Sequence, residues 1–227
     1  TAMIEESAAP LALIERNFAV DSTGFGTTTY RRWFDEKWGK EKSEQVWVKC
    51  HAMVGVTTNV VTSAAVSNAG DAPMLPPLLT ATAQRFQIGD VIGDKAYASH
   101  RNVTAVHAAG GTPFLAFKEN ATGRGPELWR RMYAHFMAER PSFLTHYHQR
   151  SNVEATFSAI KRKYGPNVRS KLPTAQANEI LAKIVAHNLS CLVMTIHETG
   201  LRPTFWSAPT APTLSSSDLD DTIDEAQ

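Results

Sequence analysis

Two short apolar runs in the first half of the chain each lead into an acidic residue. Phe18 to Val20 stop at Asp21, and Val91 to Gly93 are followed directly by Asp94. Runs of this length between polar residues are typical of buried strands. The pattern therefore predicts two strands that end at a carboxylate.

The remaining pattern predicts a hairpin, one more strand and several helices. Thr58-Asn59 separates two strand-like runs, and Gly110-Gly111 precedes another short apolar run. A helix is expected after Asp71, which we assign as its N-cap, with Pro76 and Pro77 in its first turn or delaying its start. The expected strands are 18–21, 45–56, 59–67, 91–93 and 112–117, and the expected helices are 71–86, 102–109, 127–140, 147–163 and 174–198.

This order of elements favours an α/β fold, in which a mixed sheet carries helices on its faces. Residues 30–44 are strongly polar and are predicted to form an excursion or a wide turn between the first two strands. Residues at strand ends of an open sheet are exposed at its edge, which is where the two acids are expected.

Composition narrows the class of protein. The chain has 227 residues, of which 43% are apolar, and only two cysteines, so a globular fold without a disulfide scaffold is expected. No apolar run reaches the length of about 18 residues that a membrane span needs, and no leader pattern is present. These features predict a cytoplasmic protein.

Charge is unevenly distributed along the chain. Residues 95–173 hold 13 Lys or Arg and four acids, a net charge of +9, whereas residues 207–227 hold five acids and no base. The basic segment favours a polyanionic partner such as nucleic acid. The alternative interpretation is a solvated helical surface.

The stretch YHQRSNVEATFSAIK places a single carboxylate among an aromatic and two cationic residues. Tyr147 and Lys161 lie seven residues on either side of Glu154, and Arg150 lies four residues before it. On one helix these side chains would form a stripe. The alternative is an ordinary surface pair of Arg150 with Glu154, which contributes little to stability.

The acids at the strand ends favour a functional interpretation of this stripe over a surface ion pair. Asp21, Asp94 and Glu154 together are a ligand set that Mg²⁺ prefers, and two such ions can act jointly on a phosphodiester. Asp90 is a rival to Asp94, but Asp94 directly ends the apolar run. His51, His187 and Asn188 are interpreted as structural residues.

These motifs resemble the DDE transposases of bacterial insertion sequences, in the group with a Y-x2-R-x3-E-x6-K signature. Tyr147, Arg150, Glu154 and Lys161 match the signature without a gap. VDSTGF around Asp21 and GDKAYASHRN around Asp94 are similar to the neighbourhoods of the first and second acids. The resemblance spans roughly residues 18–200.

The resemblance implies an RNase H-like mixed five-stranded sheet flanked by helices, and a catalytic role in DNA cleavage and strand transfer. Asp21, Asp94 and Glu154 would be the catalytic residues and the ligands of two Mg²⁺ or Mn²⁺ ions. The expected partners are the transposon ends and target DNA, which a homo-oligomer would bind, and no membrane is expected as a partner. The expected DNA-binding residues are Tyr147, Arg150, Lys161, Lys95, Arg101, Arg162 and Lys163, and Tyr97 is a further candidate for the DNA groove.

Three regions follow from this interpretation. Residues 1–17 are expected to be a lead-in left from a front region, residues 18–200 the catalytic domain, and residues 201–227 a disordered acidic tail. Two alternatives stay open. One is a simple RNase H-like nuclease, and the other is a catalytically inactive DNA-binding remnant.

Overall fold

The computed structural model describes residues 1–27 and 47–202. The predicted excursion at 30–44 and most of the predicted acidic tail lie outside these residues. Within them, one five-stranded sheet has the order β3-β2-β1-β4-β5. Its strands are β1 (Phe18–Gly26), β2 (Trp47–Gly55), β3 (Val61–Val66), β4 (Asp90–Gly93) and β5 (Thr112–Leu115).

Strand directions make the sheet mixed. β2 is antiparallel to both β1 and β3, whereas β4 is parallel to β1 and to β5. This order and these directions confirm the predicted RNase H-like mixed sheet. The predicted hairpin is also confirmed, and Asn59 in its turn has a positive φ of 58°. One strand boundary was predicted wrongly, because β1 does not stop at Asp21 but continues through it to Gly26.

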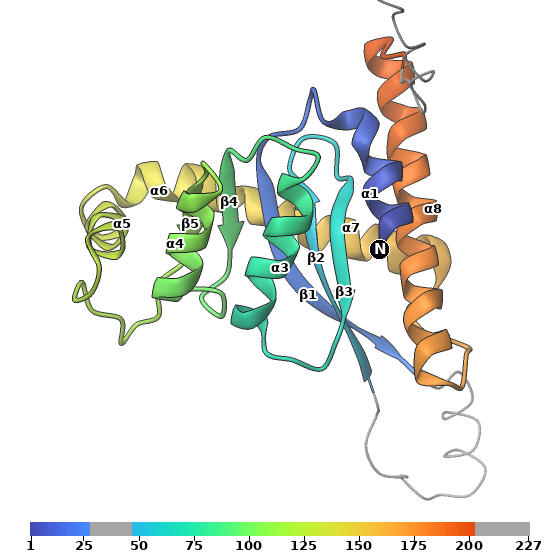
Figure 1. Cartoon of the computed structure of the whole chain (residues 1–227), viewed down its shortest axis with the longest axis horizontal. Helices are drawn as coiled ribbons and strands as arrows, with labels where there is room; N and C mark the ends of the chain where they lie inside the picture. The colour runs from blue at the N-terminus through green and yellow to red at the C-terminus, as the bar shows by residue number, and fades with distance from the viewer. Residues whose placement is uncertain (28–46, 203–227) are drawn as a thin grey trace, which may run out of the picture.

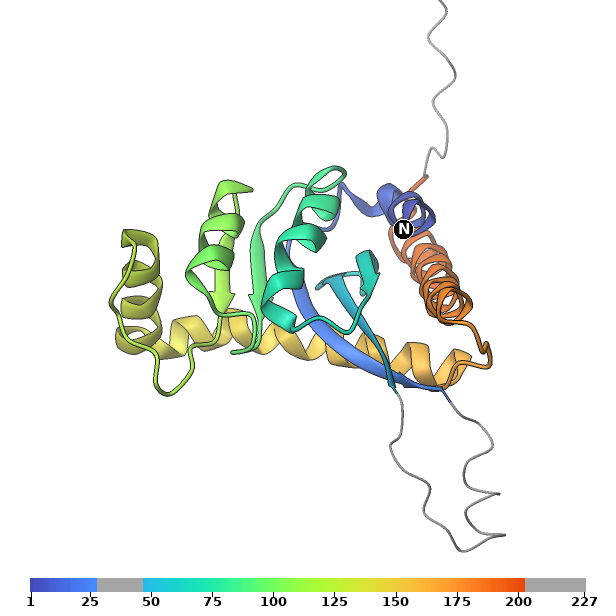
Figure 2. The ribbon, with the colours of Figure 1, turned by 60° about the horizontal axis from the view of Figure 1, so that its bottom comes forward.

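Helices cover both faces of the sheet (Figures 1 and 2). On one face lie α3 and α4, and α7 crosses the other face. α5 and α6 extend beyond the β5 side, and α1 and α8 pack together at the β3 side. The helices are α1 (Ala2–Ala8), α3 (Asp71–Ala83), α4 (His100–Ala108), α5 (Glu127–Ala138), α6 (Arg140–Tyr147), α7 (Ser151–Tyr164) and α8 (Pro173–Thr199), with short 3₁₀ turns η1 (Ala9–Leu11) and η2 (His148–Arg150).

The beginning of α3 differs from the prediction. Gly70 is its N-cap, and Asp71 is the first helical residue. Pro76 and Pro77 lie inside the helix, past its first turn. A proline has no backbone N–H, so these two residues leave the carbonyls of Ala72 and Pro73 without their usual helical donors.

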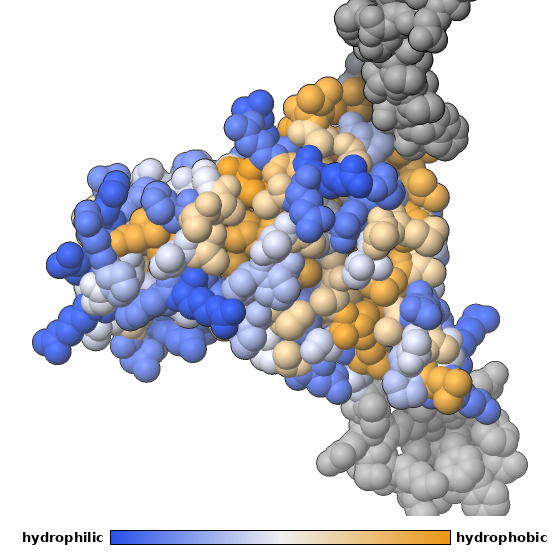
Figure 3. Space-filling view, in the orientation of Figure 1, coloured by the Kyte–Doolittle hydropathy of each residue, from blue (hydrophilic) through white to orange (hydrophobic). Residues whose placement is uncertain are grey.

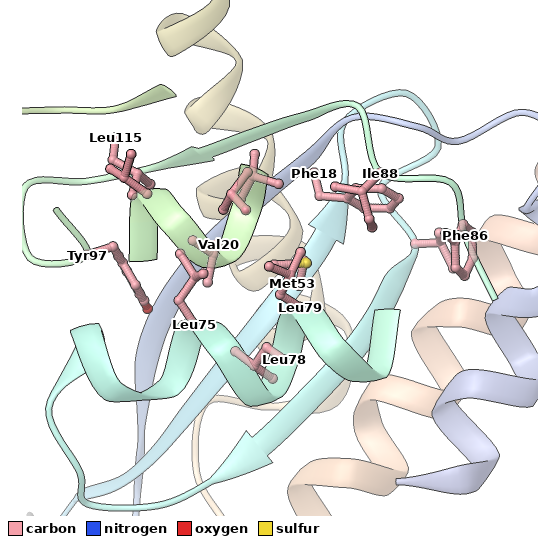
Figure 4. Close-up of a cluster of buried hydrophobic side chains, with 14 of the residues drawn as sticks. Phe18, Val20, Met53, Leu75, Leu78, Leu79, Phe86, Ile88, Tyr97 and Leu115 are labelled. Atoms are coloured by element: carbon pink, nitrogen blue, oxygen red, sulfur yellow. The ribbon is translucent and has the colours of Figure 1, made fainter. Parts of the chain in front are cut away.

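Two apolar clusters hold the layers together. The cluster between the sheet and α3 includes Phe18, Leu75 and Tyr97, and Figure 4 shows these side chains meeting between strands and helix. The second cluster packs Phe157 and Ile160 of α7 against the opposite face of the sheet. β1 contributes to both clusters because successive strand residues point to opposite faces. The same alternation separates Asp21 from Ser22.

The residues before β1 are part of the core. Ile4 and Leu11 are buried, and buried Glu15 accepts hydrogen bonds from the backbone N–H groups of Thr57 and Thr58 in the β2–β3 turn. Residues 1–17 therefore pack on the same sheet as the rest of the described chain.

α8 combines a buried side with an exposed apolar side. By length and composition, it is the one helix in the described ranges that could cross a membrane. Leu189, Val193 and Met194 are exposed, and Figure 3 shows hydrophobic residues on the surface where α8 runs. Its other side packs on β3, where buried Asn188 bonds both the N–H and the carbonyl of Val61. These contacts are those of a helix that covers a sheet edge.

Candidate active site

The parallel pairing of β1 with β4 brings the first two acids together. Val20 of β1 is in register with Gly93 of β4, and Asp21 and Asp94 are the next residues along these two strands. The backbones of neighbouring strands lie about 4.8 Å apart. A side chain at Gly93 would meet Leu115 at 2.9 Å and Val20 at 3.0 Å, which explains why glycine precedes Asp94.

Glu154 reaches the same region from α7. It lies in the first turn of this helix, and Arg150 links it to β1. The Nη2 atom of Arg150 lies 2.6 Å from Oε1 of Glu154, and its Nη1 atom lies 3.4 Å from Oδ2 of Asp21. Arg150 thus joins a carboxylate from a strand to a carboxylate from a helix.

Electrostatics show that the acids share one environment. Burial raises the pKa of the Asp21 carboxyl above its ordinary value, and the negative charges of Asp94 and Glu154 raise it further. The N–H of Ser22, at 2.8 Å from Oδ1, and the charge of Arg150 act in the opposite direction. The net effect is a raised pKa, chiefly because the carboxyl group is partly buried, and a cation bound there would favour its ionised form.

The three acids do not form a ready cation cage in the described part of the chain, where no group of three metal-ligating side chains lies close enough to hold an ion. Arg150 takes the position between Asp21 and Glu154. The chemistry of the donors nevertheless fits Mg²⁺ or Mn²⁺, since both prefer carboxylate oxygens. The set fits such a cation once the Arg150 guanidinium gives way to it.

The predicted single helix from Tyr147 to Lys163 is interrupted. α6 ends at Tyr147, the 3₁₀ turn η2 follows, and α7 begins at Ser151. Tyr147 stacks on Phe143, and burial raises the pKa of its hydroxyl, with Arg150 and Asp94 acting on it as nearby charges. The signature residues therefore come from three consecutive elements, α6, η2 and α7. Tyr147 and Arg150 still lie near Asp21 and Glu154.

Lys161 lies further along α7 and contacts β1 beyond Asp21. Its Nζ atom donates to the Thr23 hydroxyl at 2.6 Å and lies 5.4 Å from the centre of the Phe25 ring. Burial lowers the pKa of its ammonium group. Because Thr23 is two residues from Asp21, Lys161 places a positive charge on the same face of β1 as that acid.

The other predicted DNA contacts are spread around the molecule. Lys95 lines a cavity of about 440 Å³ together with Lys118, Arg140 and Tyr147, next to Asp94. Arg101 is exposed on α4, which covers the opposite face of the sheet from α7 (Figure 2).

Near the end of α7, Arg162 and Lys163 are exposed, and Lys163 donates to Ser190 of α8. The structure thus groups Tyr147, Arg150, Lys161 and Lys95 around the acids. It does not bring Arg101, Arg162 and Lys163 to the same place.

Sequence reasoning also misplaced one residue and missed a set of others. Tyr97 is fully buried and does not line a surface groove. On the far side of β1, Ser22 bonds Asp71, which in turn pairs with Lys49. Asp71 precedes an apolar helical stretch, so its sequence context indicated a cap and gave no sign of a contact with the residue beside Asp21.

An RNase H-like sheet with one acid on β1 and another directly after the neighbouring strand β4 supports a nuclease or polynucleotidyl transferase class. The family model described as "Transposase DDE domain" matches residues 14–189, and the chain belongs to this family. The family model supports a transposition-related nuclease class for this chain.

Other comparisons are distant. No curated protein sequence matches the chain. Among solved structures, the chain is similar to one from a simian T-cell lymphotropic virus intasome in complex with the PP2A regulatory subunit B56 gamma, with a TM-score of 0.42 and 15% identity. The match covers 88% of this chain and 56% of that chain. At this level of similarity, it adds nothing to the family assignment.

Proposed function

We propose that this chain carries out metal-dependent DNA cleavage and strand transfer, with Asp21, Asp94 and Glu154 as the catalytic carboxylates. The observation that supports this most directly is the convergence of the three acids from β1, the end of β4 and α7. Two Mg²⁺ or Mn²⁺ ions held there would activate a nucleophilic oxygen and stabilise the leaving oxygen of a phosphodiester.

The surrounding residues suit a DNA backbone. Arg150 and Lys161 place positive charge beside the acids, where the phosphate next to the scissile bond would lie. Tyr147 presents a partly buried ring at the same site, and Lys95 and Arg140 add charge around the adjacent cavity. In this proposal the chain acts as a homo-oligomer that holds the transposon ends and the target DNA.

A direct test uses a labelled duplex that carries the terminal repeats flanking the gene, a target plasmid, and Mg²⁺ or Mn²⁺. Products joined to the plasmid are the expected result. Cleavage without joining would replace the proposal with a simple nuclease. Binding without either reaction, unchanged by Asp94→Ala, would show an inactive DNA-binding protein.

Replacing Arg150 by methionine is expected to have opposite effects on cation binding and on DNA reaction. The free protein should bind Mn²⁺ about fivefold more tightly, because the cation no longer competes with a guanidinium held by partly exposed ion pairs. The cleavage rate should fall, because the phosphate loses a partner. Mn²⁺ titration followed by electron paramagnetic resonance checks the first effect.

Arg162→Met is the matched control, since Arg162 is exposed on α7 and takes no part in the contacts between the acids. It should leave Mn²⁺ affinity unchanged. Equal Mn²⁺ affinity in Arg150→Met and the parent protein would show that Arg150 does not stand in for a cation.

A further inference from the structure

A polar cluster lies behind Asp21, on the face of the sheet that α3 covers. Ser22 is in register with His51, and Gly24 with Lys49, so the side chains of Ser22, His51 and Lys49 share one face. The carboxylate of Asp71 meets them from the start of α3. We call Ser22, Lys49, His51 and Asp71 the rear cluster.

Asp71 is the centre of the rear cluster. Its Oδ1 atom accepts a hydrogen bond from the Ser22 hydroxyl at 2.8 Å and lies 2.9 Å from Nζ of Lys49. Burial acts to raise the pKa of Asp71, but the hydrogen bonds from Lys49 and Ser22 outweigh it and hold that pKa below its ordinary value. Asp71 is therefore an ionised acceptor that holds the residue next to Asp21.

His51 contributes less to the cluster. It is fully buried, and burial lowers the pKa of its imidazole. Its Nε2 atom lies 3.2 Å from the carbonyl oxygen of Ser67, and its Nδ1 atom lies 3.4 Å from Oδ1 of Asp71, so both ring nitrogens face acceptors. Lys49 and Ser22 make the shorter contacts with the Asp71 carboxylate, at 2.9 Å and 2.8 Å.

The first turn of α3 is also tied to the loop that follows Asp94. The side-chain amide of Asn102 donates to the carbonyl of Ala72 at 2.9 Å and to the carbonyl of Tyr97 at 2.7 Å. Ala72 can accept this bond because Pro76, four residues later, has no N–H to offer it. A proline that is unusual inside a helix thus frees an acceptor for a tertiary contact.

Tyr97 completes the connection between the two acids. It is fully buried three residues after Asp94, and Figure 4 shows its ring extending toward α3. Burial raises the pKa of its hydroxyl, and the charges of Asp71, Asp21 and Asp94 raise it further. The first turn of α3 consequently contacts the residue after Asp21 and the loop after Asp94.

We propose that Asp71 is a positioning residue: through Ser22 and the first turn of α3, it fixes the spacing between Asp21 and Asp94. Asp71 bonds Ser22 on the face of the sheet opposite α7, and it acts through the backbone of β1. This inference rests on the proposed function, because the spacing matters for cation binding and phosphodiester chemistry. Residues that orient ligands in this way commonly change metal affinity or activity by about 10–100-fold when they are replaced.

Asp71→Ala tests the inference with two readouts. In the purified protein, Mn²⁺ affinity should fall about tenfold, and the kcat for cleavage should fall by a similar factor while the KM for DNA stays within about twofold. Asp71→Asn keeps an oxygen for the Ser22 hydroxyl and should recover part of both losses. Measurements are made well below the melting temperature of each variant, so that every sample is folded.

Two further variants make the result specific. Ser22→Ala removes the same link from the strand side, and adding it to Asp71→Ala should cause little additional loss, as expected for residues that act as a pair. Glu127→Ala is the matched control, because Glu127 is an exposed acid in the first turn of α5. It should leave Mn²⁺ affinity and kcat unchanged. If Asp71→Ala does not fold, the Mn²⁺ affinity and kcat of Ser22→Ala alone test the inference.

The outcomes separate this inference from the proposed function. Parent-like Mn²⁺ affinity and kcat in folded Asp71→Ala or Ser22→Ala, whatever their melting temperatures, would assign Asp71 a structural role only and overturn the inference. If the parent protein binds Mn²⁺ but neither cleaves nor joins DNA, the proposed function fails, and the Mn²⁺ affinities of the variants still decide the inference. If the parent protein binds no Mn²⁺, both fail.

Discussion

Asp21→Asn is expected to reduce DNA cleavage at least about 10³-fold, which corresponds to roughly 4 kcal/mol of lost transition-state stabilisation. Asn keeps the size of the side chain and can still accept the 2.8 Å hydrogen bond from the Ser22 N–H, so the fold should persist. What it removes is the negative charge that the proposed cations require. Asp94→Asn and Glu154→Gln should cause losses of the same order.

Asp90→Asn is the matched control for these substitutions. Asp90 begins the same strand that ends before Asp94, but it pairs with His146 at 2.6 Å, away from the contacts between the acids. Its cleavage rate should stay within about threefold of the parent rate, since it lies outside the reacting groups. A gel assay with end-labelled duplex measures the rates, and a binding assay confirms that each variant still holds DNA.

Retained cleavage in Asp21→Asn or Asp94→Asn would contradict the assignment of the catalytic carboxylates. A large loss in Asp90→Asn together with activity in Asp94→Asn would move the second acid to Asp90. Asp90 was the rival in the sequence, and only this pair of variants separates the two by function.

Asn188→Ala is expected to lower the free energy of unfolding by about 3 kcal/mol, because several buried polar groups would lose their partner at once. Asn188 is fully buried, accepts from the Val61 N–H at 2.9 Å, and donates to the Val61 carbonyl at 2.8 Å and to the Ser7 hydroxyl at 3.0 Å. It serves the edge strand β3 as a neighbouring strand would. For a chain of this size, the melting temperature should fall by roughly 6–12 °C.

Asn178→Ala provides the control on the same helix. Asn178 is exposed on α8, so its replacement should change the free energy of unfolding by less than about 0.5 kcal/mol. Urea denaturation followed by circular dichroism measures both variants. Equal stability of the two variants would show that α8 is held to β3 by its apolar contacts alone.

Much of the fold could be predicted because it depends on local signals. The Thr58-Asn59 turn between two strand-like runs and Gly200 after the long last helix are features of short sequence windows, and both are confirmed, with Gly200 in the left-handed conformation at the end of α8. The end of β1 was missed because polar residues after Asp21 look like a turn. In the structure, β2 pairs with β1 as far as Gly26 and supplies the hydrogen bonds.

The site shows the same division between local and distant contacts. The pairing of Arg150 with Glu154 could be predicted, since residues four apart remain neighbours even where η2 gives way to α7. The bond from Ser22 to Asp71 joins residues 49 positions apart, and only the packing of α3 on the sheet creates it. The breaks at Tyr147 and Ser151 were also invisible to a periodicity argument, because the spacing of side chains does not show where a short 3₁₀ turn replaces α-helix.

The central claim is that Asp21, Asp94 and Glu154 form one cation site. Diffraction from crystals soaked in MnCl₂, recorded where manganese scatters anomalously, tests it most directly. The account predicts anomalous peaks in contact with all three carboxylates and an Arg150 guanidinium that has left the position between Asp21 and Glu154. Manganese bound to other residues, or its absence from these acids at saturating concentration, would contradict the account.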